Sequence, residues 1–126
     1  MTKSYALPKS ERLHSLSALR RLFTDGTSHF AYPFRYTVYS TKSTTTSVEV
    51  LFSVPKRFHK RANKRNLLRR RTKEAYRLNK HLLDDYLSAS CQDIDLALVY
   101  STKDVLPYKT IENAICRILA EIAKSN

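Results

Sequence analysis

Residues 56–80 read KRFHKRANKRNLLRRRTKEAYRLNK and hold twelve basic residues and one acidic residue, Glu74, for a net charge of +11. The whole chain of 126 residues carries a net charge of +12, so the rest of it is close to neutral. The segment lacks glycine and proline, and Arg, Lys, Leu and Glu favour helices. A narrow apolar stripe recurs at helical spacing from about Asn63 onward: Leu68, Thr72, Ala75, Leu78 and Leu82. The stretch predicts a basic helix that packs through one narrow side, with Asn63 as a helix N-cap or an RNA contact.

This concentration of charge indicates a polyanionic partner. Arg65, Arg69 and Lys73 follow one another at intervals of four, and like charges at that spacing repel by about 0.2–0.5 kcal/mol per pair unless an anion neutralises them. A membrane-surface helix would show a broad face of Trp, Phe and Leu, whereas the stripe here includes small residues. A DNA reader presents a few base-reading side chains, often in a symmetric dimer, whereas this segment offers charge along its length. We therefore expect structured RNA, not DNA or a membrane, with a merely solvated helix face as the alternative.

The flanking segments predict one α+β domain with the element order α-β-β-α-β-α. Leu16, Leu19, Leu22 and Phe23 recur at helical spacing, which predicts a helix over 15–25 that Gly26 ends in the left-handed conformation. Strands are expected at 30–39, 47–54 and 93–101, and a last helix after Pro107. Residues 1–14 show no periodic pattern and are interpreted as a flexible arm, so the domain is expected to span 15–126.

Alternation along the expected strands predicts which faces are buried. One face of the first strand is apolar and is expected to be core: Phe30, Tyr32, Phe34, Tyr36 and Val38. The other face is mixed and includes Arg35, Thr37 and Tyr39. The short Ser/Thr loop predicts that the first two strands are antiparallel neighbours, which would place Leu51 and Ser53 across from the mixed face. The last helix has an apolar stripe for packing: Ile111, Ala114, Ile115, Ile118, Leu119 and Ile122.

No catalytic or metal-binding motif is visible. The four histidines lack metal-ligand spacing, and a single glycine excludes a glycine-rich phosphate loop. His59 lies among cations and is expected to belong to the anion-binding surface. Cys91 and Cys116 are interpreted as buried thiols of a reducing cytoplasm. Asp93 and Asp95 could bind a divalent ion, although a solvated strand edge is favoured. Any enzymatic activity is expected to come from a partner.

The string KRANKRNLLRRRTKEAYR at 60–77 resembles the signature of the bacterial ribonuclease P protein component, in which Arg-Asn-Arg opens a basic helix that ends in Arg-Glu-Ala-aromatic-Arg. Arg65 and Asn66 match the first two positions, Arg69 and Arg70 match the Lys-Arg that follows, and residues 73–76 match the helix end. LRRLFTDGTS at 19–28 is similar to the family's first helix and turn, and the resemblance covers roughly residues 10–122. Two departures stand out. Leu67 replaces the third signature position, and Leu19 and Thr37 lie where relatives often carry aromatic residues.

The resemblance implies that the catalyst is an RNA subunit, which uses Mg²⁺ to hydrolyse the bond between a 5′ leader and precursor tRNA. The protein would dock on that RNA and hold the leader, without a dedicated metal site of its own. The implied RNA contacts are Lys56, Arg57, Lys60, Arg61, Lys64, Arg65, Asn66, Arg69, Arg70 and Lys73. The implied leader-binding cleft, between the first helix and the open sheet face, comprises Leu19, Phe23, Arg35, Thr37 and Tyr39.

The family further implies a cytoplasmic ribonucleoprotein. Its fold would resemble the second domain of a small-subunit ribosomal protein, with a left-handed β-α-β crossover through the basic helix. The competing interpretation is a ribosomal or other structural RNA-binding protein that takes no part in RNA processing. A stand-alone nuclease is the weaker competitor, because no acid–base or metal cluster is visible.

Overall fold

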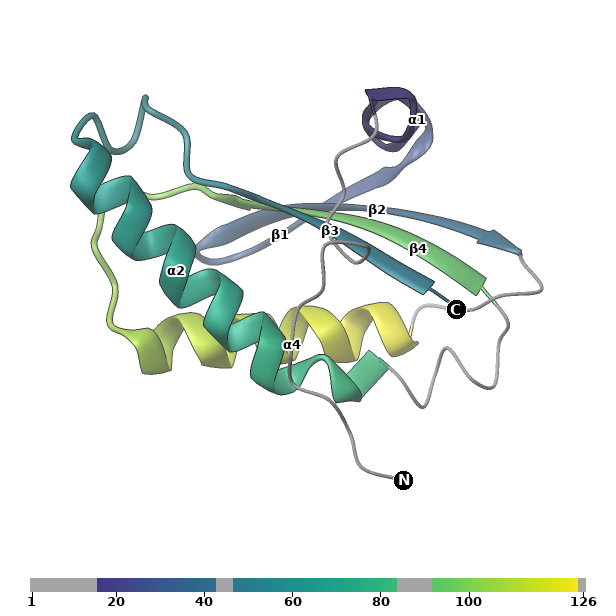
Figure 1. The fold of residues 1–126 in the computed structure, drawn as a ribbon. Helices are drawn as coiled ribbons and strands as arrows, with labels where there is room; N and C mark the ends of the chain where they lie inside the picture. The colour runs from purple at the N-terminus through teal and green to yellow at the C-terminus, as the bar shows by residue number, and fades with distance from the viewer. Residues whose placement is uncertain (1–15, 43–46, 84–91, 125–126) are drawn as a thin grey trace.

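Helices lie on both sides of one four-stranded sheet in the computed structural model, which describes residues 16–42, 47–83 and 92–124 (Figure 1). Two helices, α2 (Ala62–Asn79) and α4 (Tyr108–Lys124), cover one face, and α1 (Leu16–Asp25) lies on the other. None of the described helices is long and apolar enough to cross a membrane. The expected arm at 1–14 and the thiol of Cys91 lie outside the described residues. The α+β class is confirmed.

The sheet has four strands, one more than the sequence predicted. They are β1 (Thr27–Ala31), β2 (Phe34–Lys42), β3 (Ser47–Ser53) and β4 (Gln92–Tyr100), in the spatial order β1-β2-β4-β3. β2 pairs antiparallel with β1 and β4, whereas β3 pairs parallel with β4. The helix α2 forms the crossover connection between β3 and β4. The expected direct pairing of the segments at 30–39 and 47–54 is therefore wrong. β4 takes the place between them because residues 94–98 are buried on both faces of the strand.

The aromatic segment at 30–39 is a hairpin rather than one strand. Tyr32 and Pro33 form the turn between β1 and β2, and Phe30 pairs with Arg35 across it. Residues paired across an antiparallel ladder point to the same face, so the alternation expected from a single strand reverses at the turn. Phe34 is buried as expected, whereas Phe30 is 59% exposed and Tyr32 is 46% exposed, and neither belongs to the core.

The core lies between the sheet and the pair α2 and α4. All six apolar residues expected on the last helix are fully buried. On α2, the buried residues are Leu68, Thr72, Ala75 and Tyr76, so the predicted stripe is confirmed over its first part. It fails at Leu82, which is 40% exposed, because α2 ends at Asn79 and Leu83 takes the buried position after it.

The first helix is confirmed, but the reason for its glycine differs from the prediction. Gly26 has no positive φ, so it is not a left-handed helix stop. A Cβ atom there would lie 2.3 Å from the carbonyl oxygen of Leu22 and 3.0 Å from that of Val38. Glycine is needed because a Cβ would collide with the Leu22 carbonyl in the last turn of α1 itself and would also press on Thr37 and Val38 of β2. At this point α1 meets β2, on the sheet face opposite α2 and α4.

Candidate nucleic-acid interface

A basic surface follows the outer side of α2 and the loop before it. We define it as the ten residues for which RNA contact was predicted: Lys56, Arg57, Lys60, Arg61, Lys64, Arg65, Asn66, Arg69, Arg70 and Lys73. None of these residues is buried. Within the described part of the chain, none of them forms an ion pair with an acidic side chain. The structure thus brings the predicted cations together and leaves their charges uncompensated.

Glu74, the single acid of the segment, pairs with Arg77 and not with the basic surface. Both carboxylate oxygens of Glu74 accept hydrogen bonds from Arg77, one of them at 3.2 Å from Nε. These bonds lower the pKa of the Glu74 carboxyl, so it stays ionised. Because Glu74 pairs with Arg77, it leaves the charge of Arg69, Arg70 and Lys73 unneutralised.

Two arginines of the segment also hold the local backbone. Nη1 of Arg65 donates to the carbonyl oxygens of His59, at 3.0 Å, and Lys60, at 2.7 Å, which ties the loop to the start of α2. Nη1 of Arg71 donates to the carbonyl oxygen of Leu106 at 2.5 Å. Arg65 therefore has a structural role, and its predicted RNA contact would involve its remaining donors.

His59 does not belong to the anion-binding surface, contrary to the prediction. Its side chain is 6% exposed, and Nε2 lies 2.8 Å from the carbonyl oxygen of Thr102. A carbonyl oxygen only accepts, so Nε2 is the protonated ring nitrogen. The cations around His59 in the sequence point outward, while its own ring packs near that of Tyr100.

The N-terminus of α2 has neither a side-chain cap nor an acidic residue in its first turn. Arg61, not Asn63, is the N-cap residue, and it makes no side-chain capping bond. The first turn holds no acidic residue. The positive end of the helix dipole thus lies beside Lys60, Arg61 and Lys64 with no carboxylate in its own first turn, a combination that favours a phosphate group.

The predicted leader cleft lies where α1 crosses the sheet. Leu22 and Ala97 are fully buried against each other, with Leu19, Tyr39 and Leu51 packed around them. Thr37 is buried as well, and its hydroxyl lies 3.1 Å from that of Ser28. Of the five predicted cleft residues, Phe23 is 57% exposed and Arg35 is exposed, whereas Leu19 and Tyr39 are partly buried.

An arginine that the sequence analysis missed lies beside these residues. The guanidinium of Arg21 lies 5.1 Å from the centroid of the Tyr39 ring, and its Nη2 lies 3.3 Å from Oδ2 of Asp95. Asp95 is 8% exposed, so the expectation of a solvated strand edge is wrong for it. Arg21 and Asp95 could have been found only by knowing that α1 crosses β4. Within the described residues, no cluster of His, Cys, Asp or Glu side chains could hold a metal ion.

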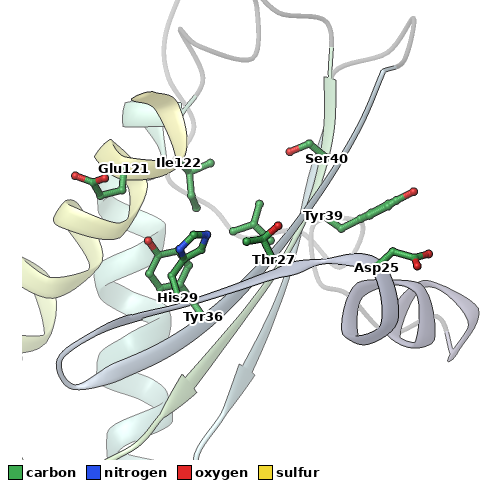
Figure 2. Close-up of a pocket in the computed structure, with 9 residues that line it drawn as sticks. Asp25, Thr27, His29, Tyr36, Tyr39, Ser40, Glu121 and Ile122 are labelled. Carbon is green, nitrogen blue, oxygen red and sulfur yellow. The ribbon is translucent and has the colours of Figure 1, made fainter. Parts of the chain in front are cut away.

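A separate groove of about 690 Å³ lies at the β1 edge, between the sheet and α4 (Figure 2). His29 stacks on Tyr36 there, with ring centroids 5.3 Å apart, and Asp25 and Glu121 lie along the rim. Burial and the charge of Glu121 raise the pKa of Tyr36. Among the described residues, the lining holds two acids and no lysine or arginine, and the groove lies at the β1 edge of the sheet, whereas α2 packs against β3 at the opposite edge. The groove is therefore unsuited to RNA phosphates.

The chain is similar to known proteins over most of its length. Residues 7–122 match the family model described as Ribonuclease P. The chain is 35% identical over 122 residues to the ribonuclease P protein component of Porphyromonas gingivalis, covering 95% of this chain and 88% of the relative. It is 32% identical over 115 residues to that of Chlorobaculum tepidum, covering 83% and 74%.

Solved structures share the fold. The RNase P protein from Thermotoga maritima superposes with a TM-score of 0.69 at 20% identity, covering 88% of this chain and 96% of that one. The RNase P protein of Staphylococcus aureus gives a TM-score of 0.63 at 22% identity, covering 92% and 97%.

Proposed function

The chain belongs to the ribonuclease P protein component family, and from this premise we propose that it binds the RNA subunit of ribonuclease P together with the 5′ leader of precursor tRNA. In this proposal the RNA subunit, with bound Mg²⁺, hydrolyses the phosphodiester bond that joins the leader to the tRNA. The protein contributes binding and positioning, and acts in the cytoplasm.

The observation that carries the proposal is the uncompensated basic surface. Ten accessible residues lie along α2 and its preceding loop. None of them forms an ion pair with an acidic side chain in the described part of the chain. Phosphates of a folded RNA would neutralise these cations and release condensed counterions, which drives association. Arg65 and Arg71 brace the backbone, so the remaining side chains are presented from a rigid helix.

The leader would lie over the sheet face that carries α1. Phe23 on α1 offers an exposed ring for stacking on a base, and Arg35 on β2 offers a cation for a phosphate. A base–aromatic stack is worth about 1–3 kcal/mol and accepts any base, which suits an enzyme that processes many precursor tRNAs. Binding the leader on the protein while the RNA holds the tRNA body would position the scissile bond.

The test is reconstitution. The purified chain is added to a cognate ribonuclease P RNA at low Mg²⁺ with 5′-end-labelled precursor tRNA, and leader release is measured. We expect stimulation by the complete mixture and no cleavage by nuclease-treated protein alone. If the protein binds ribosomal RNA but never stimulates leader release with both partners folded, the structural RNA-binding alternative holds and this proposal is wrong.

A further inference from the structure

The hairpin of β1 and β2 places an exposed aromatic ring beside an exposed arginine. Phe30 pairs with Arg35 across the hairpin, so the two side chains point to the same face. Neighbouring pairs show which face this is. Ser28 and Thr37 are hydrogen-bonded under α1, and one residue on, His29 stacks on Tyr36 toward α4. Phe30 and Arg35 are therefore on the α1 side.

The α1 helix covers one row of the sheet and leaves the next row open. In the covered row, Thr37 is 6% exposed and Ala97 is fully buried. In the next row the strand registers align four residues, none of them buried: Phe30, Arg35, Val99 and Ser53. Three inter-strand spacings make this row about 14 Å long. At its β3 end the chain continues through Pro55 into the basic surface at Lys56.

We propose that Phe30 and Arg35 form a subsite for single-stranded RNA, in which the Phe30 ring stacks on a leader base and Arg35 binds the adjacent phosphate. The inference deepens the proposed leader binding and rests on it. Phe30 is 59% exposed on an edge strand and is not part of either apolar cluster, so packing does not explain an aromatic residue there. An aromatic ring next to a cation is the combination that sequence-tolerant single-strand binding uses.

Two of the predicted cleft residues offer no ring for stacking on a base. Leu19 packs against the sheet, and Thr37 is buried beneath α1. An exposed aromatic ring stands one row away from them, at Phe30. The uncovered row then links this ring to the cations at the start of α2 along one continuous path.

Because the chain contains no tryptophan, Phe30→Trp creates a single fluorescent reporter at the site. The variant is titrated with a single-stranded RNA of leader sequence, and stacking on a base is expected to quench the tryptophan emission in a saturable way. His29→Trp is the matched control, since His29 is exposed on the same strand but faces α4. Its emission should not change. Absence of quenching at Phe30→Trp, or equal quenching in both variants, overturns the subsite.

Affinity provides the second measurement, on the reconstituted holoenzyme. Phe30→Ala should weaken binding of precursor tRNA about 5- to 150-fold, the range of one lost base stack, while mature tRNA binds as before. Phe30→Tyr should restore it. Equal loss for both RNAs, or no loss, contradicts the subsite. If wild-type protein stimulates leader release but the Phe30 variants match it, only the subsite fails. If wild-type protein never stimulates, the proposed function fails, and the fluorescence titration still decides the subsite.

Discussion

The positive charges on α2 should lower the folding stability of the free protein and raise its affinity for RNA. Substitution of Arg69 allows the two effects to be measured separately. Its neighbours at i−4 and i+4 are Arg65 and Lys73, both cations. Each such pair repels by about 0.2–0.5 kcal/mol, so Arg69→Gln should stabilise the free protein by about 0.4–1 kcal/mol. Glutamine keeps most of the aliphatic stem and has a similar helix propensity.

The expected shift is measurable. For a domain of this size, about 0.4–1 kcal/mol corresponds to a rise in Tm of roughly 2–4 °C. The rise should appear at low ionic strength and disappear near 1 M salt, where charges are screened within about 3 Å. In RNA binding the same variant should lower the log–log salt slope by about 0.7–0.9, the value for one lost phosphate contact.

Arg70→Gln is the matched control for the stability effect. Arg70 has Asn66 at i−4 and the acid Glu74 at i+4, so removing its charge relieves no i,i+4 repulsion. We expect the same loss of salt slope in RNA binding but no rise in Tm. The reasoning is refuted if Arg69→Gln lowers Tm at every salt concentration, or if the slope of RNA binding is unchanged in both variants.

Three further changes test the cleft, the α1 contact and the α4 packing. Phe23→Ala should weaken leader-bearing precursor by about 1–3 kcal/mol more than mature tRNA, and an equal loss for both would exclude a leader role. Gly26→Ala should destabilise the fold by about 1–3 kcal/mol in urea denaturation, because its Cβ would lie 2.3 Å from the Leu22 carbonyl oxygen; an unchanged midpoint contradicts this. Burial and a hydrogen bond to Glu112 raise the pKa of Tyr108 to about 12, so the folded state holds this proton more tightly than the unfolded chain does. Stability is then complete below pH 10 and declines as the pH rises from 10 to 12, and Tyr108→Phe should flatten that decline; parallel profiles would disprove it.

Elements with one buried face were predictable from the sequence. The stripe on α4 is confirmed at all six positions, because a single amphipathic helix buries one side whatever lies opposite. The basic surface was predictable for a similar reason, since an array of unpaired cations has to remain in water. Local periodicity and charge are sufficient for both.

Features that depend on how segments meet were not predictable. The faces of β1 were misassigned because a two-residue turn at Tyr32–Pro33 resets the alternation, and an aromatic run gives no sign of that reset except the proline. The sheet order was wrong because a short loop suggests neighbouring strands, whereas burial on both faces brings β4 into the centre. Thr37 and Arg35 share a face, and only the position of α1 makes one buried and the other exposed.

The narrow stripe of α2 explains how one helix both anchors the fold and presents so much charge. Four buried residues attach it to β3 and α4, and the hydroxyl of Thr72 is satisfied by the carbonyl oxygen of Leu68 at 2.8 Å. The larger apolar stripe of α4 forms much of the core, so α2 is free to carry cations around most of its circumference. Substitutions on the outer side of α2 should therefore change RNA affinity without unfolding the domain. A charge at Ala75 should instead unfold the domain, because that position is fully buried.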